Sequence, residues 1–187
     1  MRPARIASIV FLMLVSVPAF VRAQSRGGGF WMSGGVGGGW TRVSCAICTP
    51  ARTLGPTAHV RVGTSLRPGM LLGAEANGWT RNRDEGGRAW SGSIGAVAFL
   101  YPKPEGPFFV KAGVGYMTYR ADEGVNTGNV GVQLGAGYEF RVGGSLYLTN
   151  YANLHASSFG SLRADGAVAV DDVSLSMLQI GVGITRR

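Results

Sequence analysis

Apolar and polar residues alternate one by one along most of this chain, in segments separated by glycine, proline and polar stretches. The clearest segment covers residues 130–141, where Val, Val, Leu, Ala, Tyr and Phe alternate with Gly, Gln, Gly, Gly, Glu and Arg. Successive side chains of a strand point to opposite faces, so this period of two predicts a strand with one apolar face. Residues 108–116 and 59–66 repeat the pattern.

The pattern predicts eight strands, at residues 30–42, 57–66, 70–81, 88–101, 107–120, 128–141, 145–156 and 173–185. Short connections rich in glycine and proline follow the second, fourth and sixth segments, and longer polar connections follow the others. Short periplasmic turns alternating with longer outer loops are typical of outer-membrane barrels. We therefore predict an all-β fold: an antiparallel, up-and-down transmembrane β-barrel of about eight strands.

The polar face of these strands indicates which side lies inside. It carries few charges among many glycines: Arg61, Glu75, Lys111, Glu139 and Arg141. A soluble barrel turns its polar face to water, whereas a membrane barrel turns an apolar band to lipid and flanks it with aromatic residues. Aromatic residues lie near strand ends on the apolar face, at Trp40, Tyr116, Tyr138 and Phe140. This arrangement favours the membrane barrel, with a soluble secreted or periplasmic β-barrel as the alternative.

The N-terminus predicts export. Arg2 and Arg5 precede the apolar run of residues 6–20, and small residues lead to a cleavage site between Ala23 and Gln24. The run is short for a membrane anchor, which needs roughly 20 apolar residues. We expect a cleaved signal peptide at residues 1–23 and one barrel domain at residues 24–187.

Composition narrows the function. The chain has 31 glycines and a formal net charge of +8, part of which leaves with the arginines of the leader. The glycines lie within alternating strands rather than at a strand-to-helix turn, so they predict no phosphate-binding loop. We expect no cofactor, no metal and no nucleic-acid partner.

Three strings resemble the small outer-membrane β-barrel proteins related to the transmembrane domain of outer membrane protein A. They cover residues 109–116, 135–140 and 178–184. The resemblance implies an outer-membrane location, contact with outer-membrane lipid and lipopolysaccharide, insertion by the barrel assembly machinery, and a structural or surface-interaction role, with an extracellular or periplasmic protein as a further partner. Family members end the last strand with an aromatic residue, where this chain has Arg186 and Arg187.

The five charges of the polar face have two interpretations. They line a narrow pore or gate, or they pair with one another and fill the lumen. Eight strands enclose a space just wide enough for side chains, and buried charges are costly unless paired. The second interpretation is favoured. His59, on the same face, is expected in the lumen or at an interface.

Cys45 and Cys48 are the two cysteines of the chain. An oxidising envelope favours a disulfide between them. A redox pair, half of a metal site and two reduced thiols are the alternatives.

A second constellation predicts a hydrolase as the lesser alternative. His155, Ser157 and Asp171 follow an order that resembles the lipid A deacylases, with Ser157 as nucleophile, His155 as base and Asp171 orienting the imidazole. The alternation turns His155 and Ser157 toward the lumen, away from a lipid substrate.

Arginines of the predicted loops suggest a third class, adhesion or ligand binding. They are Arg81, Arg83, Arg88, Arg120 and Arg163. Arginine binds phosphate and carboxylate groups well, so these residues would bind an anionic partner or neutralise the lipid phosphates of the outer leaflet.

Overall fold

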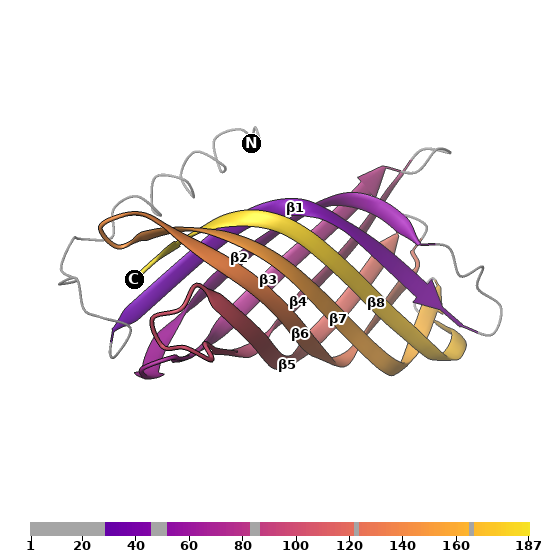
Figure 1. Cartoon of the computed structure of the whole chain (residues 1–187). Helices are drawn as coiled ribbons and strands as arrows, with labels where there is room; N and C mark the ends of the chain where they lie inside the picture. Colours follow the sequence, from indigo (N-terminus) through magenta and orange to yellow (C-terminus); the bar gives the residue numbers. More distant parts are fainter. Residues whose placement is uncertain (1–28, 46–51, 83–86, 122–123, 165–166) are drawn as a thin grey trace, which may run out of the picture.

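The protein is a closed barrel of antiparallel strands. The computed structural model describes residues 29–45, 52–82, 87–121, 124–164 and 167–187. Its eight strands are β1 (Phe30–Ser44), β2 (Thr53–Arg67), β3 (Met70–Asn82), β4 (Arg88–Leu100), β5 (Phe108–Ala121), β6 (Asn126–Gly143), β7 (Leu146–Ala164) and β8 (Ala167–Arg186). Each strand pairs with the next, and β1 pairs with β8 (Figure 1). The predicted up-and-down barrel is confirmed. The predicted signal peptide lies outside the described residues.

The last hairpin differs from the prediction. We expected a long loop at residues 158–172, but β7 continues to Ala164 and β8 begins at Ala167. The pairing of these strands shifts register three times between Ser157 and Arg163, and Asp172 has a positive φ of 58°. Each irregularity interrupts the period of two on which the sequence prediction depended, so the strand was mistaken for a loop.

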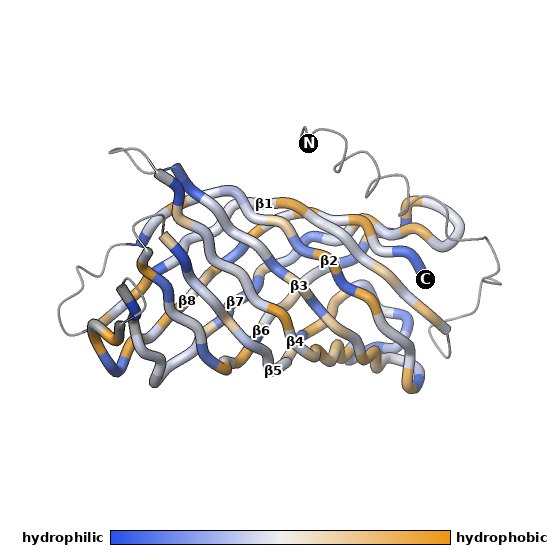
Figure 2. Tube along the Cα trace, turned by 180° about the vertical axis from the view of Figure 1, so that it is seen from behind, coloured by the Kyte–Doolittle hydropathy of each residue, from blue (hydrophilic) through white to orange (hydrophobic). Residues whose placement is uncertain are grey.

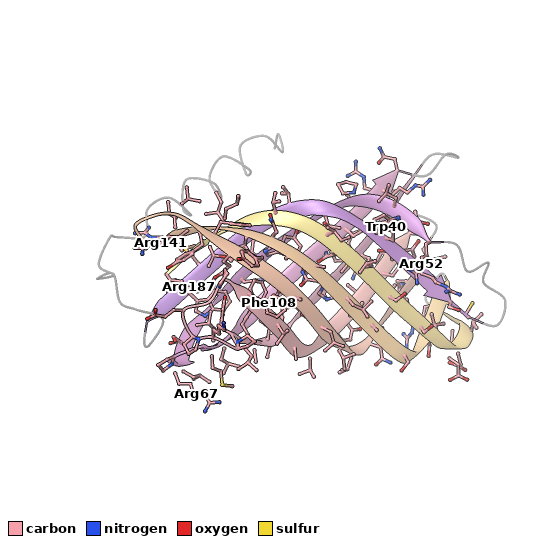
Figure 3. The ribbon with its side chains drawn as sticks, viewed as in Figure 1. Trp40, Arg52, Arg67, Phe108, Arg141 and Arg187 are labelled. Carbon is pink, nitrogen blue, oxygen red and sulfur yellow. The ribbon has the colours of Figure 1, made fainter. Side chains whose placement is uncertain are left out.

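The connections define two ends of the barrel. The connections β2–β3, β4–β5 and β6–β7 lie at one end, together with the start of β1 and the end of β8; we call this the turn end, and the opposite one the loop end. Gly69 and Gly144 adopt left-handed φ values of 79° and 50° in two of the turns, a conformation that glycine tolerates best. Arg67, Arg141 and Arg187 lie at the turn end, and Trp40 and Arg52 at the loop end (Figure 3).

The outer surface of the barrel is apolar. Hydrophobic and hydrophilic positions interleave along the strands (Figure 2), and the exposed ones on the middle of the barrel include Val36, Val60, Ile94, Val114, Val130, Val132, Leu134, Leu154, Ile180 and Val182. Tyr116, Tyr138 and Phe140 are exposed on the same face, and Trp40 is half-buried. The barrel formed by the described strands is closed, without an unpaired edge strand, so this surface suits the hydrocarbon of a bilayer. A soluble barrel would carry the reverse arrangement.

No helix among the described ranges is long and apolar enough to cross a membrane.

Candidate functional site

The centre of the lumen holds a buried ion cluster around Glu75. Arg61 lies directly opposite Glu75 on the neighbouring strand, and its Nε donates to the carboxylate. Lys111, from β5, donates from Nζ to both oxygens at 2.6 and 2.8 Å. Asn77 Nδ2 adds a hydrogen bond of 2.7 Å. The three charged side chains are almost completely buried, so Glu75 neutralises cations from strands that are not neighbours of each other.

Inward-facing glycines make room for these side chains. A Cβ atom added to Gly135 would lie 2.5 Å from Asn153 Oδ1 and 3.2 Å from Lys111 Cε. One added to Gly181 would lie 2.5 Å from the hydroxyl of Tyr151. The lumen side chains therefore lie directly over glycine backbone, which explains why the polar face of the strands is so rich in glycine.

An aromatic layer fills the lumen between the ion cluster and the turn end. Trp31 and Phe99 meet edge to face with ring centres 5.2 Å apart, and Phe109 lies 5.5 Å from Phe99. The layer consists of Trp31, Leu71, Val97, Phe99, Tyr101 and Phe109. Our sequence reasoning expected only small and charged residues inside. Phe109 has the same strand parity as Lys111, so the alternation itself contained the signal.

Arg187 closes the turn end. Its Nη2 donates to both carboxylate oxygens of Glu139, at 2.6 and 2.8 Å, and to the hydroxyl of Tyr101. Its guanidinium carbon lies 4.9 Å from the ring centre of Tyr101 and 5.2 Å from that of Tyr147. We call this group of four residues the end cap.

The structure corrects the predicted place of Arg141. Its side chain is exposed, and its Nε donates to the carbonyl of Gly144 in the β6–β7 turn at 3.1 Å. Position 141 lies close to the end of β6, beyond the packed part of the lumen. The predicted set of five charges is therefore two clusters, one around Glu75 and one formed by Glu139 with Arg187.

Polar and apolar side chains fill the rest of the lumen toward the loop end. His155 Nδ1 lies 3.3 Å from Ser93 Oγ, and His59 packs edge to face on Tyr151 with ring centres 4.5 Å apart. Nearer the loop end Trp79 donates from Nε1 to the carbonyl of Gly39 at 3.0 Å. Trp79 packs with Ala89, Met177 and Tyr119. The described side chains thus occupy the lumen from the end cap to the Trp79 cluster.

The three residues of the hydrolase hypothesis do not come together. His155 and Ser157 are buried on the lumen side of β7, as the alternation predicts. Asp171 is exposed and accepts a hydrogen bond of 2.9 Å from Ser161. The strand pairing places Asp171 about 20 Å along the barrel from His155. His155 lies instead beside Ser93, with its Nε2 4.0 Å from Glu75.

Cys45 follows β1 and is disulfide-bonded. Its predicted partner Cys48 lies outside the described residues, so the pairing stays a prediction. Within the described part of the chain, no group of three or more His, Cys, Asp or Glu side chains is arranged to hold a metal ion.

The arginines of the predicted loops lie at the loop end. Arg81, Arg88, Arg120 and Arg163 lie at or near strand ends there, and the side chains of the last three are exposed. Arg42 and Arg52, which our sequence reasoning did not single out, lie at the same end, beside the β1–β2 connection. Arg83 lies outside the described residues.

Comparison with known proteins gives a likeness of structure. No family model matches the sequence, and neither does any curated protein. Neisserial surface protein A has a TM-score of 0.61 at 13% identity, covering 86% of this chain and 98% of its own. Ail, the attachment invasion locus protein of Yersinia pestis, has a TM-score of 0.52 at 13% identity, covering 83% and 97%.

The outer membrane protein OprG of Pseudomonas aeruginosa has a TM-score of 0.51 at 10% identity, covering 88% of this chain and 99% of its own. Such low identities relate folds rather than activities. The match runs over almost the full length of each of these barrels, and the apolar exterior agrees with it. The chain therefore has the fold of the small eight-stranded outer-membrane β-barrels.

Proposed function

We propose that this protein is an integral outer-membrane barrel with a structural and surface-interaction role, which presents its loop end to the outside of the cell. The observation that carries the proposal is the packed lumen. The end cap, the aromatic layer, the cluster around Glu75 and the Trp79 cluster follow one another from the turn end to the loop end. A barrel filled in this way has no wide pathway for a solute. We therefore place the function on the surface of the loop end, outside the membrane.

The loop end has the chemistry of an anion-binding surface. Exposed arginines lie there on separate strands, among them Arg88, Arg120 and Arg163. Guanidinium groups bind sulfate, phosphate and carboxylate with paired hydrogen bonds. The exposed Asp171 and Asp172 lie in the same region, so this surface carries both positive and negative side chains. It therefore favours a partner whose anionic groups contact the arginines directly.

Two of the similar barrels support this choice. One is named as a surface protein and another for attachment and invasion. A further structure of Ail is a complex with the heparin analogue sucrose octasulfate. We propose by analogy that the loop end of this protein binds anionic sugars, either sulfated polysaccharide or the phosphorylated sugar of lipopolysaccharide.

Binding of heparin to the protein in nanodiscs of neutral phospholipid tests the proposal. A variant with Arg81, Arg120 and Arg163 changed to alanine should bind at least about tenfold more weakly and depend less on salt. The matched control changes Arg67 and Arg141 to alanine, two exposed arginines of the turn end. Equal affinities of the two variants would contradict a binding role for the loop end.

A further inference from the structure

A small void lies where the aromatic layer meets the end cap, beside Tyr101, which belongs to both. Its lining includes Trp31, Arg61, Phe109, Glu139 and Arg187. The space open to the centre of a water molecule is about 10 Å³, close to the minimum that holds one such particle. The void therefore suits a single water-sized particle and excludes an organic ligand.

The residues around the void carry buried N–H groups without a hydrogen-bond partner. They are Trp31 Nε1, Arg61 Nη2, and Nε and Nη1 of Arg187. Trp31 and Arg61 are only 3% and 2% exposed. Indole and guanidinium groups are donors only, and a buried donor left unpaired is costly. A hydrogen-bond acceptor bound in the void would therefore stabilise these donors.

The acceptors that line the void already have partners. Both carboxylate oxygens of Glu139 accept hydrogen bonds from Arg187. The hydroxyls of Thr149 and Thr185 are 2.9 Å apart, and Thr185 donates to Ser33 Oγ at 3.0 Å. The unpaired donors thus face a lining whose oxygens are engaged with other groups.

Buried charge favours an anion over water. Arg61, Lys111 and Arg187 are three cations in this half of the lumen, and Glu75 and Glu139 are the two carboxylates that the structure places against them. When side chains alone are counted and the histidines are taken as neutral, one positive charge is left without a counter-charge among the described lumen residues. An uncompensated charge in a low-dielectric interior is strongly unfavourable. Water would satisfy the donors but not the charge.

We propose that this void binds one small inorganic anion of halide size, with chloride as the natural occupant. The indole N–H of Trp31 and the guanidinium groups of Arg61 and Arg187 hold it. The anion would join the aromatic layer to the end cap and so stabilise the turn end of the barrel. This site lies inside the barrel near its turn end and does not depend on the surface role proposed above.

The test is the thermal stability of the purified barrel in uncharged detergent, read as the temperature at which the folded band is lost on a gel. Chloride replaces gluconate at constant ionic strength. From about 1 mM to about 300 mM chloride the midpoint should rise by about 2–4 °C, since a ligand that binds only the folded state stabilises it. Trp31→Phe keeps a ring in the aromatic layer but removes the donor, and should lose this rise.

Trp79→Phe is the matched control, because the indole of Trp79 donates to Gly39 near the loop end, away from the void. This variant should keep the chloride response. Arg61→Lys, which retains the charge beside Glu75 but removes Nη2, should weaken it. Crystals grown in bromide should show an anomalous peak between Trp31 and Arg187.

Two results would overturn the proposal. Equal midpoints in chloride and gluconate would mean that the void holds water only. A chloride response that survives in both Trp31→Phe and Arg61→Lys, with no bromide peak beside Trp31, would mean that the anion binds elsewhere.

Discussion

Glu75 is the residue on which the centre of the lumen depends. It accepts hydrogen bonds from Arg61, Lys111 and Asn77. Glu75→Gln removes the counter-charge of two buried cations, and breaking a buried pair from one side costs about 3–5 kcal/mol. We expect the free energy of unfolding, measured by urea titration in lipid vesicles, to fall by about this amount.

Glu105→Gln is the control for that measurement, because Glu105 is exposed in the β4–β5 connection. Its unfolding free energy should stay within about 0.5 kcal/mol of the unmodified protein. If Glu75→Gln were as stable as Glu105→Gln, the central cluster would not hold the lumen together.

Gly135 and Gly143 allow a matched test of lumen packing within one strand. A Cβ atom at Gly135 would press on Asn153 and Lys111, whereas one at Gly143 meets nothing within 4 Å. Gly135→Ala should destabilise the barrel by about 1–3 kcal/mol, the usual cost of overpacking, and Gly143→Ala should not. Urea titration of both variants checks this, and equal stability would argue that the lumen is loosely filled.

Sequence alternation predicted at residue scale which way a side chain points. His155 and Ser157 are buried on the lumen side of β7, as the alternation predicted. Parity does not predict which residue lies across the lumen, because that depends on the stagger of all eight strands. Glu139 therefore pairs with Arg187, which the sequence analysis did not place in the lumen, and Arg141 lies outside the charge clusters of the lumen.

At the scale of elements, turns and regular strands were predictable and the last hairpin was not. Short connections such as that at Gly69 have turn residues whose conformation is fixed locally. The outer part of β7 and β8 pairs with shifts of register that leave no periodic pattern in the sequence. The expected loop at residues 158–172 was thus a strand pair of irregular register.

That irregular part should be the weakest section of the hairpin. Hydrogen exchange should be faster for backbone amides of residues 160–164 and 167–173 than for those of residues 146–157, whose pairing with β8 is continuous, since local opening is easiest where ladder bonds are interrupted. Exchange followed by mass spectrometry in detergent measures both regions. Equal protection would show that the described parts of the two strands open as one unit.

For the molecule as a whole, the packed lumen predicts a closed channel. Side chains from the end cap at Arg187 to the cluster at Trp79 fill the interior. The purified protein in planar lipid bilayers should give no steady conductance above the bare membrane, since the interior of an eight-stranded barrel is just wide enough for its side chains. Long-lived open steps from the unmodified protein would contradict this account and assign it a pore function.

The central claim is a closed barrel inserted in the outer membrane, with an apolar exterior and a filled interior. The most direct measurement is fractionation of expressing cells, followed by gel mobility of the outer-membrane fraction with and without boiling. We expect the protein in that fraction, with a folded band that shifts on boiling, because the ladder that closes β1 onto β8 resists detergent at room temperature. A protein that stays in the soluble fraction and shows no shift would contradict the claim.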